Sequence, residues 1–346
     1  MGKKTASLPP SAPSTDHPPR LLQKLSQKLF ADPTEQQAFM QPILVPQPFL
    51  PAILWLAPQP DPAPFAVATR LDWQPHFVDR LLTETRPGKH PLHQQGAFYC
   101  LDFSSVFAAA VLQGIDRSIE VIIDLCAAPG GKSIFAWKLL QPSLLISNEV
   151  IGKRMGALIS NLKRCHIQPA YAICRDPSLL ATALPQTADL VLVDAPCSGQ
   201  SLLAKAEKNP GCFHPVTIGK NANRQKRILA NAAQIVAPQG FLAYMTCTYA
   251  PEENEQVCTW LLERFPHLQP IAVPLLDAYR SPLAEFPCYR MFPQSGLGAG
   301  AFTILLKHQD DSTPLPLPSD RLTTFLQQHQ DYQIGNQRNE ATASPL

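Results

Sequence analysis

The sequence lacks several features that would place it in a common class. Its nine cysteines are an odd number and include no CxxC pair, which argues against a disulfide framework and against a zinc module. Its formal net charge is only +2, so any nucleic-acid surface must be a local patch. The apolar run at residues 49–57 is far shorter than the ~20 residues that span a membrane. We therefore expect a cytoplasmic protein with reduced thiols, no metal and no membrane contact.

Two familiar nucleotide-binding patterns are also absent, since the chain contains neither GxxxxGK[ST] nor GxGxxG. What is present is an apolar strand at residues 121–123 that ends at Asp124, followed by the turn Ala128-Pro129-Gly130-Gly131 and a helical pattern from Ser133. Adjacent glycines allow the backbone to approach a ligand, and the helix N-terminus supplies free N–H groups. A loop this short favours a small zwitterion over a polyphosphate, so it predicts a cofactor cradle.

Strand and helix patterns alternate along the middle of the chain, which predicts an α/β fold with a parallel sheet and helices on both faces. In such sheets ligands bind at the carboxyl ends of the strands. We expect strands at 121–124, 144–148, 170–174, 189–194, 240–246, near 271 and at 301–306, with helices at 103–112, 133–140, 153–165, 222–236 and 252–263.

The two ends of the chain differ in composition from this middle part. The predicted division is a Pro/Ser-rich disordered tail (1–20), a small N-terminal α+β domain (21–92), the alternating domain (93–308) and a polar C-terminal tail (309–346). In the small domain we expect helices at 21–30 and 33–43, an irregular Pro-rich segment at 46–64, a strand at 65–71 and a helix at 76–85; in the tail we expect a helix at 321–328.

Polar residues follow four successive strands of the predicted sheet. They are Glu149, Asp176, Asp194 and Cys247, and Asp194 leads into a Pro-Cys-Ser-Gly turn that contains Cys197. Because these strand ends meet in space, the two cysteines should face one cleft. A lone Asp at a strand end is more often a helix cap than a ligand, and an apolar cysteine such as Cys126 is also consistent with simple packing.

Three motifs carry a resemblance to a known family. The stretches DLCAAPGGK from Asp124, DAPCSG from Asp194 and TCTYAPEENE from Thr246, in that order, resemble the motifs of the S-adenosylmethionine-dependent RNA (cytosine-5) methyltransferases of the RsmB/RsmF/NSUN family. The resemblance covers roughly residues 96–307. It implies the doubly wound, Rossmann-like sheet of class I methyltransferases, with S-adenosylmethionine as the cofactor.

The resemblance also implies roles for individual residues. Cys247 is the nucleophile, Cys197 assists product release, and Asp194 lies beside both the cofactor and the target base. Cytosine C5 is a poor nucleophile, so a thiolate that adds first to C6 makes C5 reactive. The cofactor residues implied are Cys126, Ala127, Ala128, Pro129, Gly130, Gly131 and Lys132 at the methionine end, Glu149 at the ribose and Asp176 on the adenine side.

A local excess of positive charge precedes and enters the predicted long helix. Lys205, Lys208, Lys220 and Arg224, together with Lys226 and Arg227, face a single acidic neighbour, Glu207. We interpret the group as an RNA backbone contact over the active site, whereas Lys226 or Arg227 taken singly fits a solvated helix face equally well. The chain departs from the family's usual Arg-x-Asn-Thr at residues 66–69, which read AVAT, and from its Arg-x-x-Pro-His at residues 290–294, which read RMFPQ.

The function we expect is RNA cytosine-5 methylation by a monomer, with ribosomal RNA favoured over transfer RNA by analogy with bacterial relatives. DNA cytosine methylation is the nearest rival, but it would use the Pro-Cys thiol as nucleophile, and the Glu-Asn-Val of those enzymes is absent. A non-catalytic RNA-binding or ribosome-assembly factor on the same fold is the alternative from a different class. The presence of Cys197, Cys247, Asp194 and the complete Gly loop argues against that alternative.

Overall fold

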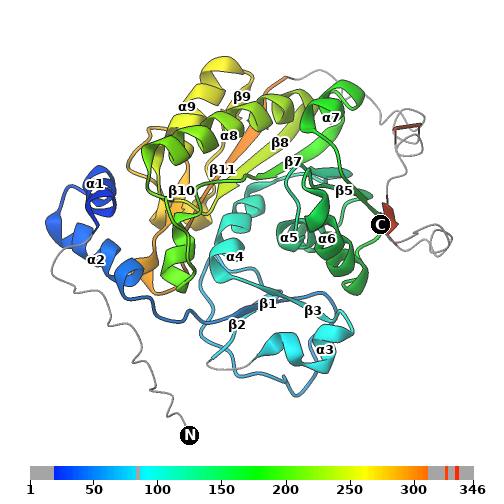
Figure 1. The fold of residues 1–346 in the computed structure, drawn as a ribbon. Helices are drawn as coiled ribbons and strands as arrows, with labels where there is room; N and C mark the ends of the chain where they lie inside the picture. Colours follow the sequence, from blue (N-terminus) through cyan, green and yellow to red (C-terminus); the bar gives the residue numbers. More distant parts are fainter. Residues whose placement is uncertain (1–18, 83–85, 311–323, 326–331, 335–346) are drawn as a thin grey trace, which may run out of the picture.

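A twisted sheet with helices on both faces forms the main body of the chain (Figure 1). The computed structural model describes residues 19–82, 86–310, 324–325 and 332–334. Within these residues the strand order is β10-β11-β8-β7-β4-β5-β6-β12, with β9 beside β11; β4 to β8 are mutually parallel, and the other four pair antiparallel. The strands are β4 (Val121–Asp124), β5 (Leu144–Asn148), β6 (Ala170–Ile173), β7 (Ala188–Asp194), β8 (Val236–Thr246), β9 (Leu268–Pro270), β10 (Tyr289–Met291), β11 (Ala301–His308) and β12 (Tyr332–Ile334).

The parallel strands are apolar at nearly every position because both of their faces are buried. In β4, Ile122 belongs to a core cluster under α4, α5 and α6, whereas Val121 and Ile123 belong to a second cluster under α7, α8 and α9. Successive side chains of a strand point to opposite faces, so one short segment stabilises both layers. These helices are α4 (Phe103–Ala110), α5 (Gly131–Leu140), α6 (Gly152–Arg164), α7 (Pro177–Ala183), α8 (Pro215–Ile235) and α9 (Glu255–Arg264).

In the sheet, β5 and β6 lie on one side of β4, whereas β7 and β8, which follow in the sequence, lie on its other side. This reversal opens a crevice at the carboxyl ends of the strands, which is where doubly wound sheets bind ligands. The predicted α/β fold of the class I methyltransferases is therefore confirmed. None of the helices in the described part of the chain has both the length and the apolar character needed to cross a membrane.

The segment before β4 contains a second, three-stranded antiparallel sheet of order β2-β1-β3, made of β1 (Ala52–Trp55), β2 (Val78–Arg80) and β3 (Phe98–Leu101). Three predictions are wrong here. The central strand β1 lies within the segment predicted to be irregular, the region predicted as a helix at 76–85 contains β2, and the predicted strand at 65–71 is reduced to an isolated bridge between Val67 and Leu81. The sheet also extends past the predicted boundary at residue 92, since β3 lies beyond it.

Helices α1 (Arg20–Leu29) and α2 (Pro33–Leu44) confirm the two predicted N-terminal helices. They pack through Leu22, Leu25 and Phe39 against Tyr249 and Ala299 of the main body, rather than on the small sheet. The predicted tail at 1–20 lies almost wholly outside the described residues, and so does the predicted helix at 321–328 apart from residues 324–325. Between residues 86 and 310 the structure also contains the short helix α3 (Pro91–Gln94) and the 3-10 turns η1 (Pro87–Lys89), η2 (Val111–Gly114), η3 (Gln200–Lys205), η4 (Pro251–Glu253), η5 (Pro274–Tyr279) and η6 (Pro293–Ser295).

Candidate active site

Hydrogen bonds to Asp124 support the loop between β4 and α5. The Asp124 carboxylate accepts hydrogen bonds from the Cys126 amide (3.1 Å) and the Ser133 hydroxyl (2.6 Å), and complete burial raises its pKa to about 7. Gly130 has a φ of 110°, a backbone conformation that residues with a side chain rarely adopt. A Cβ on Gly131 would lie only 2.7 Å from the Leu101 side chain, so a larger residue does not fit there. The two glycines thus serve the turn and the packing of the loop on β3. A Cβ on Gly130 would lie 3.3 Å from the Leu158 side chain, so both missing side chains border protein atoms, and the approach of the loop backbone to a cofactor stays a prediction.

A cavity of about 610 Å³ lies at the carboxyl ends of the parallel strands. This central cavity is within the range of ordinary small-molecule sites, about 300–1,000 Å³. Residues after each of β4 to β8 line it, and α8 closes one side with Arg224, Arg227, Ile228 and Asn231. The i, i+3, i+4, i+7 spacing of these four explains why they share one face of the helix.

Two of the predicted cofactor residues, Glu149 and Asp176, lie at one end of the central cavity. Glu149 is buried and accepts hydrogen bonds from the Ile151 amide (2.9 Å) and the Arg154 guanidinium (2.8 Å). Asp176 caps α7, and hydrogen bonds from Ser178 lower its pKa. Asp176 thus has the capping role that a lone Asp at a strand end suggests and also lines the cavity, while its role beside the adenine stays a prediction.

Cys126 and Ala128 are the members of the predicted methionine-end loop that line the central cavity, whereas Ala127, Pro129, Gly130, Gly131 and Lys132 are not among its lining residues. The Ala127 amide is bonded to the Asn148 carbonyl (2.8 Å), and the Gly130 amide to the Ala127 carbonyl (2.6 Å). Burial raises the pKa of the Cys126 thiol well above its usual value, so this cysteine stays protonated.

The two predicted catalytic cysteines meet at the other end of the central cavity. Asp194 of β7 is the register partner of Met245 of β8, so Cys197 and Cys247 follow paired positions of neighbouring parallel strands. Their Sγ atoms are 3.2 Å apart. The prediction that both cysteines face one cleft is confirmed.

The contact between the two sulfurs favours opposite protonation states. The hydrogen bond from Cys197, helped by the Lys132 charge and a bond from Ser201, lowers the pKa of Cys247 despite the opposing effects of desolvation by the surrounding protein and repulsion from Asp194. Donating that same hydrogen bond, together with burial, raises the pKa of Cys197. Cys247 is thus the more acidic of the two thiols, and Cys197 is the one that favours the protonated form.

Lys132, which the resemblance places at the methionine end of the cofactor, forms an ion pair with Asp194. Its ammonium group lies 2.6 Å from the Asp194 carboxylate, with only 14% of its side chain exposed. Burial opposes the charged ammonium, but the attraction of Asp194 outweighs this effect and the pKa of Lys132 is raised. The pair places one positive and one negative group beside the Cys247 sulfur.

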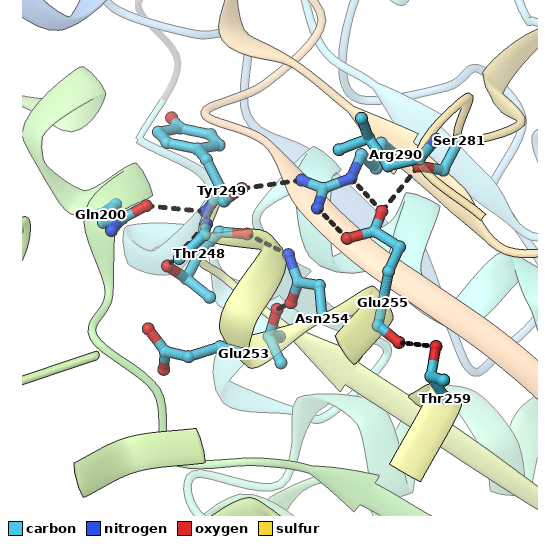
Figure 2. A network of polar contacts seen from close by, with 12 residues as sticks. Gln200, Thr248, Tyr249, Glu253, Asn254, Glu255, Thr259, Ser281 and Arg290 are labelled. Atoms are coloured by element: carbon cyan, nitrogen blue, oxygen red, sulfur yellow. Dashed lines mark hydrogen bonds and ion pairs between the residues drawn. The ribbon is translucent and has the colours of Figure 1, made fainter. Parts of the chain in front are cut away.

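Hydrogen bonds fix the backbone on both sides of Cys247, as Figure 2 shows for the segment that follows it. The Asn254 amide donates to the Thr248 carbonyl (2.9 Å) and accepts from the Thr246 hydroxyl (2.6 Å). Gln200 accepts from the Tyr249 amide (3.0 Å). Cys247 therefore lies on a segment whose polar groups are hydrogen-bonded to buried side chains.

A buried ion pair supports the same segment (Figure 2). Arg290 forms two hydrogen bonds to Glu255 and donates a third to the Tyr249 carbonyl (2.9 Å), while Ser281 donates to Glu255 (2.6 Å). The side chains of Arg290 and Glu255 are only 3% and 4% exposed. Arg290, the first residue of the RMFPQ stretch, is thus buried and supports the segment after Cys247 from inside the protein.

The turn that carries Cys197 has its own supports. Glu253 accepts hydrogen bonds from the Ser198 amide (2.8 Å) and from Gln225 (2.9 Å), and burial raises its pKa. Asn209 donates to the Ser198 carbonyl (2.8 Å) and lines the central cavity. The sequence analysis missed Glu253, Gln225 and Asn209, because nothing local marks a residue that reaches a turn from another element.

The predicted basic cluster divides into two parts. Lys220 and Arg224 are exposed on α8 and Lys208 is exposed on the preceding loop, whereas Lys205 is paired with Asp102 (2.9 Å). Outside that set, Lys226 lies over the Trp260 ring, and Arg227 lines the central cavity. Arg227 and Asn231 were not predicted to line a cavity, although their helical spacing places them on the same face of α8 as Arg224.

Comparison with known proteins places the chain in a family. The sequence model described as 16S rRNA methyltransferase RsmB/F matches residues 111–307. The Ribosomal RNA small subunit methyltransferase F of Citrobacter koseri is 32% identical over 258 residues, which are 72% of this chain and 53% of that protein. The corresponding protein of Pectobacterium carotovorum is 30% identical over 245 residues, which are 70% and 50%. The chain thus spans about half the length of the curated relatives that it matches.

Among solved structures, NSun6 from Pyrococcus horikoshii with SFG has a TM-score of 0.66 and 18% sequence identity, covering 85% of this chain and 99% of that one. This likeness supports the fold described above. Because the family model matches more than half of the chain, including all three motifs, this chain belongs to the 16S rRNA methyltransferase RsmB/F family.

Proposed function

We propose that this protein transfers a methyl group from S-adenosylmethionine to C5 of cytosine in RNA, with ribosomal RNA of the small subunit as the substrate. The observation that carries the proposal is the pair of sulfurs 3.2 Å apart at the end of the central cavity, beside the Lys132–Asp194 pair. A thiolate, a thiol, a carboxylate and an ammonium group gathered in one pocket suit covalent activation of a weakly nucleophilic base.

The donor set of the central cavity fits S-adenosylmethionine. Glu149 and Asp176 offer carboxylate oxygens for the ribose hydroxyls and the adenine side, and Cys126 and Ala128 of the loop after β4 border the methionine end. Arg154 bridges Glu149 and the Ala128 carbonyl, so it holds these two parts of the site together. When bound, the cofactor supplies an electrophilic methyl group directed towards the target base.

In the proposed reaction Cys247 adds as a thiolate to C6 of cytosine, which converts C5 into a nucleophile. The Asp194 carboxylate accepts a hydrogen bond from the amino group of the cytosine and so orients the ring, and the ion pair with Lys132 keeps that carboxylate in place. After methyl transfer a base removes the C5 proton and the Cys247–C6 bond breaks. Cys197, in contact with the leaving sulfur, donates a hydrogen bond to it and so assists its departure as a thiolate.

The RNA lies, in this proposal, across the exposed basic residues Lys208, Lys220 and Arg224, of which Arg224 lines the central cavity. Positive charge there neutralises backbone phosphates, and the target cytosine is unstacked to reach the thiols. Lys205 contributes less, because Asp102 already pairs with it. We further propose that the protein acts in the cytoplasm as a monomer.

The experiment combines the protein with unmodified small-subunit ribosomal RNA and methyl-labelled S-adenosylmethionine, then quantifies labelled 5-methylcytidine after digestion to nucleosides. We expect label with the wild type, none with Cys247→Ala, and full activity with Cys100→Ala, a matched thiol loss in the small sheet. Binding of cofactor and RNA without any labelled cytidine would contradict the proposal and favour a non-catalytic RNA-binding factor. Label in uridine or in adenosine would also contradict it.

A further inference from the structure

The Cys197–Cys247 pair has the geometry of two thiols held ready to bond. A disulfide has an S–S length of about 2.05 Å, so the two sulfurs need to approach by only about 1 Å from their 3.2 Å separation. The segments on which they lie are already tied together, since the hydroxyls of Ser198 and Thr248 are 2.7 Å apart and the Ser201 amide donates to the Cys247 carbonyl (3.2 Å). The two segments thus hold the sulfurs next to each other, and closing the bond asks for about 1 Å of sulfur movement.

The chemistry of the pair is asymmetric in the way that a peroxide reaction requires. The thiolate is the reactive form towards peroxides, and Cys247 has the lowered pKa and an exposed position in the central cavity. Cys197 stays protonated against it and is positioned to resolve an oxidised Cys247. A small oxidant has access to this sulfur through the same opening that admits the target base.

We propose that Cys197 and Cys247 are a reversible oxidation site, at which hydrogen peroxide converts the thiol pair into an intramolecular disulfide. The Cys247 thiolate attacks one peroxide oxygen and breaks the O–O bond, which gives a sulfenic acid and hydroxide. The Cys197 sulfur then displaces the sulfenic hydroxyl as water and forms the S–S bond. Overall, two thiols are oxidised, one peroxide is reduced and two waters are formed.

The remaining cysteines lack this combination of features. Burial raises the pKa of Cys100, Cys165 and Cys212 to about 11 and that of Cys288 to about 12, so these thiols stay protonated near neutral pH. Among the described residues no other two cysteine sulfurs are hydrogen-bonded to each other. Oxidation should therefore select one pair out of nine cysteines.

The consequence for the protein is a complete and reversible loss of the free Cys247 thiol. A sulfur in a disulfide cannot add to C6 of a base, so the oxidised form is unable to begin the proposed reaction. Reduction by a dithiol restores both groups through thiol–disulfide exchange. This inference concerns the thiols themselves and does not depend on the identity of the RNA.

The test treats the folded full-length chain with a small excess of hydrogen peroxide, blocks the remaining thiols in denaturant and counts them by mass. We expect the wild type to lose two of its nine thiols, to yield a Cys197–Cys247 linked peptide, and to recover both thiols with dithiothreitol. Cys197→Ala should form no linkage and should instead accumulate a dimedone-trappable sulfenic acid at Cys247. Cys126→Ala, which removes a third thiol of the same cavity, should still form the linkage.

Three results would overturn the inference: nine free thiols in the wild type after treatment, linkage of a different pair, or the same linked yield from Cys197→Ala. Failure of RNA methylation is a separate outcome, because the thiol count does not use RNA or cofactor. A chain that forms the linkage but methylates no RNA would support this inference and contradict the proposed function.

Discussion

Replacing Arg290 with methionine should destabilise the protein more than any exposed substitution of similar size. Arg290 is the partner of Glu255 and the donor to the Tyr249 carbonyl, and both charged side chains are nearly inaccessible to water. Removing one partner of a buried ion pair leaves the other charge without compensation, which typically costs about 3–5 kcal/mol. A domain has a net stability of only about 5–15 kcal/mol, so this loss should be evident in any unfolding experiment.

The double variant separates the ion pair from the rest of the packing. Glu255→Gln keeps an acceptor for the Ser281 hydroxyl, so Arg290→Met combined with Glu255→Gln no longer buries an unpaired charge. We expect the double variant to lose less stability than the sum of the two single variants, by about 2 kcal/mol, within the range seen for residues in contact. Arg280→Met, which alters an exposed arginine bonded to the Glu285 carbonyl, serves as the control and should cost about 1 kcal/mol or less.

Urea denaturation followed by tryptophan fluorescence measures these differences, provided that the slope of the transition is unchanged between variants. The reasoning would be refuted if Arg290→Met cost about 1 kcal/mol or less, or if the two single losses were simply additive. Either result would mean that the pair does not support the segment after Cys247. The alkylation rate of Cys247 in the folded variants then provides an independent measure of its position.

The other predictions concern the active site. Cys197→Ala removes the hydrogen bond that lowers the pKa of Cys247, so the pH at which iodoacetamide alkylates Cys247 half-maximally should move upward; an unchanged profile contradicts that cause. Lys132→Met leaves Asp194 without its partner and should lower the rate of methyl transfer by about 10²-fold at saturating cofactor, and an unaltered rate argues against the pair's role. Glu149→Gln should weaken calorimetric binding of S-adenosylmethionine by about tenfold or more, whereas equal affinity removes Glu149 from the cofactor site.

The main sheet could be predicted from the sequence because its signals are local. Buried parallel strands are continuous apolar runs, and the strands predicted at residues 121–124 and 144–148 match β4 and β5 in full. The small sheet could not be predicted in this way. Its central strand β1 has four residues between Pro51 and Pro58, and it exists because β2 and β3, distant in sequence, pair with both of its edges. Proline density describes the ends of such a strand and carries no information about its partners.

The same distinction between local and distant signals applies to the site. Residues that follow a strand, such as Asp194 and Cys247, were found because topology fixes where strand ends meet. The pairing of Lys132 with Asp194 was not predicted. Lys132 belongs to a motif that suggests cofactor binding, and its partner Asp194 is 62 residues away in the sequence. The early start of α8 was missed although His214 and Pro215 form a cap and first turn that sequence reasoning can recognise.

The central claim is that Cys247 forms the bond to cytosine and Cys197 is needed to release it. The most direct test mixes Cys197→Ala with small-subunit ribosomal RNA and S-adenosylmethionine and examines the products on a denaturing gel, beside Cys247→Ala and the double variant. The account predicts an RNA-linked protein band that accumulates with Cys197→Ala and is absent from the other two. A band with Cys247→Ala, or no band with any variant under conditions where the wild type methylates the RNA, would contradict it.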